Sequence, residues 1–372
     1  MDLTNLITEL SKGFAAFTWG NAVMILVGLI LIFLAIVKEY EPVLLLPIGF
    51  GCLIANLGMS NQVGFMKVIY DAGISTELFP LLIFIGVGAM IDFSPLLSQP
   101  SMVLLGAAGQ FGIYGTLLLA LALGFPLNQA ASIGVIGAID GPTAIFVGTK
   151  LAPEIVAPIA VAAYSYMSLI PIIQPPIMKL MTTRRERLIR MEYSPKPVSR
   201  LTLIIFPILV TLLVALVAPD AAPLMAALML GNLLREALVV ERLSKMAQNE
   251  LINIATLFLG LAIGSTMTAE SFFNWSTLAI LGLGLLAFVI DTVAGLLFGK
   301  LMAVITHGKV NPLIGACGIS AFPMAGRLSA KMALEEDPSN FILMHAMGSN
   351  TAGQLGSVIA GGILLALVTG IP

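Results

Sequence analysis

Charged residues are scarce in this chain. Asp, Glu, Lys and Arg make up 10% of its 372 residues, whereas 58% are hydrophobic and the mean hydropathy is +1.02. A soluble domain of this length carries about a quarter charged residues, so the composition excludes that class and predicts an integral membrane protein. The net charge of −2, without a basic tail, gives no indication of nucleic-acid binding.

Histidine and cysteine are nearly absent. Because the only histidines are His307 and His345, a histidine-based metal site is not expected. The two cysteines, Cys52 and Cys317, both lie in apolar runs. That setting is typical of small core residues rather than of a disulfide or a metal-binding pair.

Long apolar runs, by contrast, fill most of the chain. A membrane-spanning helix needs about 20 mainly apolar residues, so we predict an all-α polytopic membrane protein with about 10–12 transmembrane segments. Residues 1–19 have Leu and Phe at helical spacing and are expected to form an amphipathic helix on the membrane surface. The expected spans are 21–38, 42–58, 78–97, 101–124, 128–150, 154–180, 201–218, 221–240, 251–270, 275–299, 310–334 and 340–369.

One loop concentrates the positive charge. Residues 179–200 hold seven of the chain's 18 Lys and Arg, and the positive-inside rule places this loop in the cytoplasm. It is also the expected boundary between two halves. We predict a first membrane repeat over 20–180, a basic cytoplasmic loop over 181–200 and a second membrane repeat over 201–372.

The two halves resemble each other at three places, with nearly constant offsets of 176, 174 and 181 residues. Three matches in the same order indicate an internal duplication, and transporter folds of this kind often contain inverted repeats. The span count favours parallel repeats, and inversion requires one segment per half that does not cross, so the orientation stays open. The matches are "PIGFGCLIAN" (47–56) with "PLMAALMLGN" (223–232), "FIGVG" (84–88) with "FLGLA" (258–262), and "IGVIGAIDGP" (133–142) with "IGACGISAFP" (314–323).

The last matched pair places Pro142 and Pro323 at equivalent positions, each after a run of glycines. Proline removes a backbone donor and clashes with the preceding turn, so we expect each helix to break there. Backbone freed by a break within lipid survives only where it is buried in protein or lines a wet cavity. Breaks at matching points of two repeats therefore indicate an ion or substrate site, although a packing kink is an alternative.

Polar residues accompany both breaks. Asp140 and Thr143 lie at the first break, and Asn311, Ser320 and Arg327 lie around the second. A charge at mid-membrane is costly, so Asp140 needs a partner, which is either a bound cation or Arg327 in a structural pair. Carboxylate, hydroxyl, amide and carbonyl oxygens are hard ligands, and one negative charge suits a monovalent ion. Na⁺ or H⁺ is therefore the candidate.

The segment after each break is polar as well. "YSYMS" (164–168) follows the first break, and "GSNTAGQ" (348–354) follows the second. The tyrosines of the first segment are either part of the site or interfacial anchors. A further intramembrane acid, Asp291, is either a structural hydrogen-bond partner or a proton-path residue.

Four long segments carry a family resemblance: "GAIDGPTAIF", "YSYMSLIPIIQPPIMK", "VNPLIGACGISAFPMAGRLSAK" and "MHAMGSNTAGQLGS". They resemble the β subunit of the sodium-pumping biotin-dependent decarboxylases, which act on oxaloacetate, methylmalonyl-CoA, glutaconyl-CoA or malonate. The resemblance extends from about residue 20 to the C-terminus. It implies a membrane subunit that decarboxylates carboxybiotin, consumes a proton and drives Na⁺ export.

The resemblance also implies roles for single residues. Asp140 would bind Na⁺ and alternately a proton, Tyr166 would take part in proton delivery, and Arg327 would bind the carboxylate of carboxybiotin. The implied Na⁺ ligands are Asp140, Asn311, Gly315, Ser320 and Asn350.

The implied cofactors are Na⁺ and carboxybiotin, and the latter comes from a partner chain because no biotinylation motif is present. The expected partners are a soluble carboxyltransferase subunit, a biotin carrier protein, a small membrane γ/δ subunit, the lipid bilayer of the bacterial inner membrane and further copies of the chain. A free-standing secondary Na⁺/H⁺ or solute transporter would show the same repeats and breaks. A non-catalytic assembly anchor would explain neither the paired breaks nor Asp140.

Overall fold

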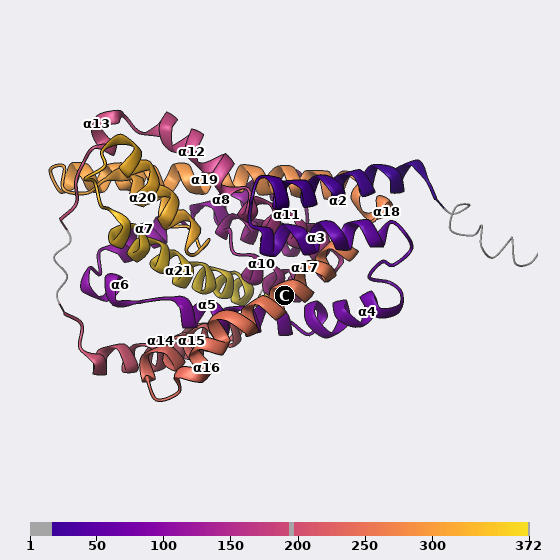
Figure 1. The fold of residues 1–372 in the computed structure, drawn as a ribbon, viewed down its shortest axis with the longest axis horizontal. Coiled ribbons are helices and arrows are strands. Elements are labelled where there is room, and N and C mark those ends of the chain that lie inside the picture. Colours follow the sequence, from indigo (N-terminus) through magenta and orange to yellow (C-terminus); the bar gives the residue numbers. More distant parts are fainter. Residues whose placement is uncertain (1–16, 193–196, 371–372) are drawn as a thin grey trace, which may run out of the picture. The chain divides into compact units, whose positions relative to one another are not determined.

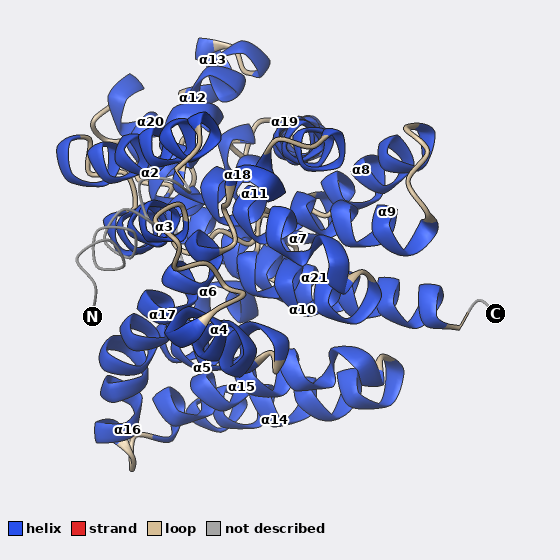
Figure 2. Ribbon diagram, turned by 90° about the vertical axis from the view of Figure 1, so that its right-hand side faces the viewer, coloured by secondary structure: helices blue, strands red, loops and turns tan. Residues whose placement is uncertain are grey.

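The computed structural model describes residues 17–192 and 197–370 (Figure 1). Throughout these two ranges the regular elements are helices and no strand occurs, so the predicted all-α class is confirmed (Figure 2). The predicted surface helix over 1–19 falls almost entirely outside the described residues. Its last residue, Trp19, begins the first described helix.

The chain divides into two compact units. Unit 1 contains the described residues up to Phe79 and the segment Thr256–Ala279, and unit 2 contains Pro80–Ala255 and the chain from Ile280 onward. Each predicted half of the sequence contributes segments to both units, so the division into two membrane repeats stays a prediction.

Unit 1 is built from the N-terminal helices and one segment of the second half, Thr256–Ala279. Helices α5, α17 and α19 each belong partly to unit 1 and continue into unit 2. The elements are α2 (Trp19–Val37), α3 (Pro42–Ala55), α4 (Gly64–Tyr70), α5 (Leu78–Met90), α17 (Ile252–Ser265), α18 (Ala269–Phe272) and α19 (Trp275–Ile305).

Unit 2 holds the remaining helices, and its long C-terminal helix packs against several of the others, among them α7, α10 and α20. The elements are α6 (Ser94–Ser98), α7 (Met102–Ala108), α8 (Phe111–Ala122), α9 (Leu127–Gly134), α10 (Gly141–Leu151), α11 (Val156–Ser168), α12 (Ile170–Met181), α13 (Arg184–Arg187), α14 (Arg200–Val217), α15 (Ala222–Ala237), α16 (Glu241–Met246), α20 (Met324–Glu336) and α21 (Leu343–Thr369).

In the described part of the chain six helices are long and apolar enough to cross a membrane, or up to eight if each of two bent helix pairs is one span. The prediction of about 10–12 segments also includes shorter and broken segments, which a count of helices of at least 18 residues leaves out. Predicted spans 128–150 and 310–334 are each split by a break, and 42–58 and 221–240 form helices of 14 and 16 residues. The six are Trp19–Val37, Met102–Ala122, Arg200–Val217, Glu241–Ser265, Trp275–Ile305 and Leu343–Thr369.

One pair of contacts mirrors the internal duplication. In unit 1 the amide of Asn56 donates to the carbonyl of Met267 at 2.8 Å, and in unit 2 the amide of Asn232 donates to the carbonyl of Ile91 at 3.0 Å. Donor positions and acceptor positions are both related by the offset of 176 residues that the sequence shows. Each half thus supplies the donor in one unit and the acceptor in the other, as expected for a duplicated chain.

Candidate functional site

The first predicted break lies between α9 and α10. A 3₁₀ turn over Val135–Ala138 follows α9, Ile139 adopts a left-handed conformation with φ of 54°, and Asp140 caps the N-terminus of α10. Pro142 stands in the first turn of α10, where its missing N–H costs nothing. The proline therefore starts a new helix after the break rather than interrupting a continuous one.

The second predicted break lies between a 3₁₀ segment, Pro312–Cys317, and α20, which begins directly after Pro323. Residues 318–323 are non-helical, and the Phe322–Pro323 peptide is cis. The backbone N–H of Ser320 donates to the carbonyl of Ala138 at 3.2 Å. The two broken helices therefore meet backbone to backbone, directly beside Asp140.

Asp140 is buried with only 4% of its surface exposed, and it is surrounded by neutral donors. Its Oδ2 accepts hydrogen bonds from the Thr143 hydroxyl at 2.7 Å, the Ser357 hydroxyl at 2.8 Å and the Gln354 amide at 3.0 Å. Its Oδ1 accepts one longer bond, 3.4 Å, from the backbone N–H of Thr143. Four neutral donors and no cationic side chain among the described residues contact this carboxyl group, so ionisation of Asp140 would give the site one net negative charge.

Arg327 does not serve as the partner of Asp140. Its side chain is exposed on α20, one turn after the second break, and in the described residues it forms no ion pair or side-chain hydrogen bond. The structural Asp140–Arg327 pair that the sequence left open is thus not formed here. An exposed and unpaired guanidinium remains free to bind an anion delivered from outside the chain.

The middle of α21 completes the site from the other side. The Ser320 hydroxyl donates to the carbonyl of Gly353 at 3.1 Å, and the Asn350 amide donates to the carbonyl of Ile319 at 2.7 Å. The structure thus brings Ser320 and Asn350 to the breaks. Three buried oxygens of α21 have no hydrogen-bond partner among the described residues: Ser349 Oγ, Asn350 Oδ1 and Thr351 Oγ1. The same holds for Gln110 Oε1, between α7 and α8.

Asn311 and Gly315 make their contacts elsewhere. Asn311 caps the 3₁₀ segment through the N–H of Leu313, and its amide donates to the carbonyls of Arg187 and Ile189. A Cβ atom on Gly315 would overlap the carbonyl of Gly295 on α19. These two residues hold the second broken helix against its surroundings, and none of their contacts reaches Asp140.

The two tyrosines of α11 point to different neighbours. Tyr166 is half-buried, and its hydroxyl donates to the carbonyl of Leu281 at 2.6 Å. The ring of Tyr164 is buried against Gly141, where a Cβ atom would overlap it, and its hydroxyl has no hydrogen-bond partner among the described residues. Tyr164 therefore packs on the first break, whereas Tyr166 contacts α19.

Sequence reasoning did not single out Ser357 or Gln110. Ser357 lies three residues after Gln354, so the two share one face of α21, and this spacing was the available signal. Gln110 lies between α7 and α8, and its amide donates to the carbonyls of Gly106, Gly318 and Gly353. Its only sequence signal was a polar residue within a glycine-rich apolar run.

Arg187 anchors the second broken helix through contacts of its side chain and its carbonyl. The guanidinium binds Glu336, at the end of α20, with contacts of 2.7 and 2.6 Å, and it donates to the carbonyl of Thr182 at 2.6 Å. The Arg187 carbonyl accepts hydrogen bonds from Asn311 and Asn340 at 3.0 Å each. One residue of the basic loop thus joins both ends of this helix to α12.

We expect Arg187→Gln to lower the melting temperature by several degrees at neutral pH, because Glu336 loses its main partner. The hydrogen bond from Arg187 lowers the pKa of the Glu336 carboxyl from its ordinary value, so the pair stabilises the fold above that value. Its contribution is lost as the pH falls through the lowered pKa, so the difference between the melting curves of the two proteins should shrink as the pH falls below the ordinary pKa of glutamate.

Arg184→Gln is the matched control, because Arg184 binds the same carboxylate at 3.3 Å from an exposed position. Exposed ion pairs contribute little, so this variant should melt like the parent. Equal shifts in both variants would contradict the anchoring role of Arg187.

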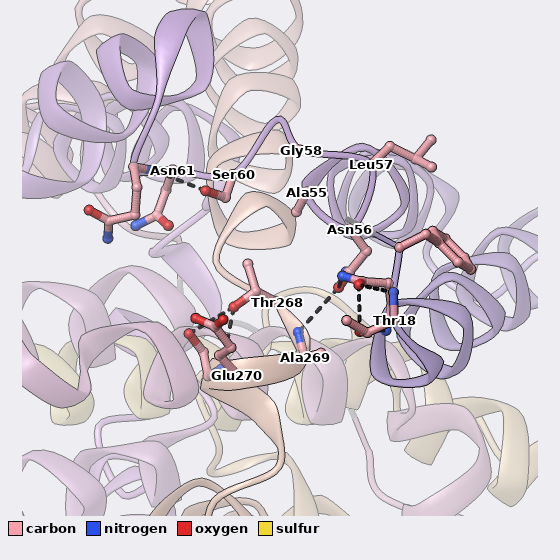
Figure 3. Close-up of a pocket in the computed structure, with 14 residues that line it drawn as sticks. Thr18, Ala55, Asn56, Leu57, Gly58, Ser60, Asn61, Thr268, Ala269 and Glu270 are labelled. Carbon is pink, nitrogen blue, oxygen red and sulfur yellow. Dashed lines mark hydrogen bonds between the residues drawn. The ribbon is translucent and has the colours of Figure 1, made fainter. Parts of the chain in front are cut away.

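A pocket of about 980 Å³ lies in unit 1, lined by the start of α2, the end of α3 and the start of α18 (Figure 3). Figure 3 shows Asn56 between Thr18 and Ala269, and the Asn56 side chain accepts from the N–H of Ala269 at 3.1 Å. Its amide is also used, in bonds to the carbonyls of Cys52 and Met267. The polar groups of Asn56 are thus already satisfied within the protein, unlike the free oxygens around Asp140.

The family model of the Na⁺-transporting oxaloacetate decarboxylase beta subunit matches residues 20–368. The chain belongs to this family. The resemblance inferred from the four sequence segments is thereby confirmed, and the match includes both breaks, Asp140 and the whole polar stretch of α21.

Characterised relatives are similar over nearly their whole length. The methylmalonyl-CoA decarboxylase subunit beta of Veillonella parvula is 53% identical, with 96% of each chain covered. The glutaconyl-CoA decarboxylase subunit beta of Acidaminococcus fermentans is 51% identical, covering 99% of this chain and 98% of that protein. The oxaloacetate decarboxylase beta chain of Klebsiella pneumoniae is 47% identical, covering 94% and 95%.

Proposed function

We propose that this chain is the membrane subunit of a Na⁺-translocating decarboxylase, in which it decarboxylates carboxybiotin, consumes a proton and exports Na⁺. The observation that carries the proposal is the position of Asp140. Its carboxylate lies where two broken helices meet, and it has neutral donors instead of a permanent cationic partner. Such a group exchanges Na⁺ for H⁺ without breaking an ion pair, which a coupled pump requires.

The proposed Na⁺ site consists of Asp140 with oxygens of the second break and of α21. Ser320 and Asn350 are both hydrogen-bonded to these elements, and Asn350 Oδ1 is free to bind a cation. Hydroxyl, amide and carboxylate oxygens suit a hard monovalent ion. Asn311 and Gly315 are proposed to act indirectly, because their contacts position the second broken helix.

The decarboxylation step requires an anion-binding group and a proton. When carboxybiotin is bound, its N–carboxylate supplies the CO₂ that leaves, and the ureido nitrogen takes up one proton. Arg327 is exposed and unpaired in the described residues, which fits a residue that binds the carboxylate of a group carried by another chain. Tyr166 is proposed to deliver the proton, through a hydroxyl that now donates to Leu281.

The chain is a multi-pass membrane protein by its apolar helices, and we place it in the bacterial inner membrane. A soluble carboxyltransferase subunit, a biotin carrier protein and a small membrane γ/δ subunit are its proposed partners. The named relatives belong to decarboxylases of three different acids yet are about equally similar to this chain. We therefore propose that a partner subunit selects the acid.

The deciding experiment measures decarboxylation of free carboxybiotin by the purified complex, with and without Na⁺. We expect CO₂ release that depends on Na⁺, and ²²Na⁺ accumulation in vesicles that stops when the carboxylated substrate is omitted. Na⁺/H⁺ exchange that proceeds at the same rate without any carboxylated substrate would instead identify a secondary transporter.

Na⁺ is also expected to protect the resting protein against heat. A ligand that binds only the folded state stabilises it by RT ln(1 + [L]/Kd), which is about 2.7 kcal/mol at a hundredfold excess over Kd. Melting curves in NaCl should therefore rise with concentration, whereas those in choline chloride at equal ionic strength should not. Identical curves over the millimolar range would contradict a Na⁺ site in the resting state.

A further inference from the structure

A third interruption lies between α7 and α8, at Gly109 and Gln110. Because a helix N-terminus leaves backbone N–H groups without intrahelical partners, the start of α8 needs acceptors from elsewhere. No side chain of its own segment caps it. Instead, the N–H of Gly112 donates to Oδ1 of Asp291 on α19 at 3.0 Å.

This interruption touches both broken helices of the site. A Cβ atom on Gly137, in the 3₁₀ turn just before Asp140, would overlap the backbone of Gly112. On the other side, a Cβ atom on Gly109 would overlap the carbonyl of Gly318 at the second break. The segment from Gly109 to Gly112, which includes the start of α8, is therefore a shared support that both breaks contact at backbone distance.

The carboxyl of Asp291 is fully buried, and the N–H of Gly112 is its one hydrogen-bond donor among the described residues. Its Oδ2 has no partner there, and no ion pair reaches it in that part of the chain. An ionised carboxylate in such a setting would cost several kcal/mol. The carboxyl is therefore neutral, and its constant contribution is the acceptor Oδ1.

We propose that Asp291 is a positioning residue that caps α8 from the neighbouring helix and so seats the support shared by the two broken helices. The sequence left two roles open for Asp291, a structural hydrogen-bond partner or a proton-path residue. The proposal assigns it the first of these roles. Under the offset of 181 residues Asp291 is equivalent to Gln110, which contacts Gly318 and Gly353. Equivalent positions of the two predicted repeats thus both bind backbone, Asp291 at the start of α8 and Gln110 at the second break.

The activity measurement in this test rests on the proposed function. The variant Asp291→Asn distinguishes a positioning role of Asp291 from a proton-carrying role. Asparagine keeps the acceptor oxygen and lacks a titratable proton. Asp291→Asn should therefore retain Na⁺-dependent decarboxylation within twofold, with an unchanged pH profile. Asp291→Leu removes the acceptor and should lower the rate at least tenfold and raise the Na⁺ concentration for half-maximal rate at least tenfold.

Thr292→Val is the matched control, because the Thr292 hydroxyl is equally buried and has no hydrogen-bond partner in the described chain. Its removal costs no hydrogen bond, so activity should stay within twofold. Should Asp291→Leu fail to fold, Asp291→Ser replaces it, since a serine side chain is too short to reach the N–H of Gly112.

Amide hydrogen exchange over residues 109–115 tests the cap without reference to activity. We expect parent-like protection in Asp291→Asn and faster exchange in Asp291→Leu or Asp291→Ser. Loss of activity in Asp291→Asn with retained protection would overturn the proposal and make Asp291 a proton carrier. Parent-like exchange in the variants without an acceptor would also overturn it. An inactive parent would instead contradict the proposed function and leave the exchange test valid.

Discussion

Replacing Asp140 by Asn is expected to abolish decarboxylation-driven Na⁺ uptake. The substitution removes the single negative charge of the site. It also replaces one carboxylate oxygen by an amide NH₂ group, which cannot accept a hydrogen bond. In the parent, Oδ2 alone accepts three hydrogen bonds. Neither Na⁺ nor an exchangeable proton can then be held. The measurement is ²²Na⁺ accumulation in vesicles that contain the whole complex, together with CO₂ release.

The matched control for Asp140→Asn is Ser357→Ala, which keeps the carboxylate and removes one of its donors, at 2.8 Å. A hydrogen bond to a charged group is worth about 1.5–3 kcal/mol, so this variant should transport Na⁺ with reduced affinity. Asp140→Asn should show no saturation by Na⁺ at any concentration. Uptake near that of the parent would make Asp140 a purely structural cap of α10.

Tyr166→Phe is expected to slow decarboxylation by about 10²–10⁴-fold, the usual worth of a positioned acid–base group. The ring stays, so packing is preserved and only the hydroxyl is lost. Protection by Na⁺ in melting experiments should barely change, because Asp140, Ser320 and Asn350 remain. Since the reaction consumes a proton, raising the pH should slow decarboxylation by the parent protein. The rate of the Tyr166→Phe variant should depend less on pH.

Tyr164→Phe is the control that the structure supplies. The Tyr164 hydroxyl has no hydrogen-bond partner among the described residues, so its loss should leave both melting temperature and turnover near parent values. Tyr166→Phe removes the side-chain hydrogen bond to the Leu281 carbonyl, at a cost of about 1 kcal/mol, which melting curves will report separately. If decarboxylation were slow in Tyr164→Phe and normal in Tyr166→Phe, Tyr164 rather than Tyr166 would be the residue that delivers the proton.

The location of the breaks was predictable from local chain chemistry. Glycine runs followed by proline end a helix wherever they occur, and residues 139–140 and 318–323 are non-helical as expected. The way in which each apolar run is divided was not predictable in this way. Apolar runs such as 128–150 meet the length criterion for a span, but the structure divides them, because freed backbone is paired with other elements, as in the bond from Ser320 to Ala138.

The sequence by itself determined the membrane class, the helical fold and the family, and it singled out Asp140 as an acid at a helix break. Composition, motifs and glycine–proline breaks can be recognised without knowledge of the fold. Only the tertiary structure decided what surrounds that acid. Gln354, which donates to Asp140, lies 214 residues further along the chain, and Arg327 lies on an exposed face instead. Which side chains meet depends on the direction each helix takes after its break, and backbone contacts between distant segments set that direction.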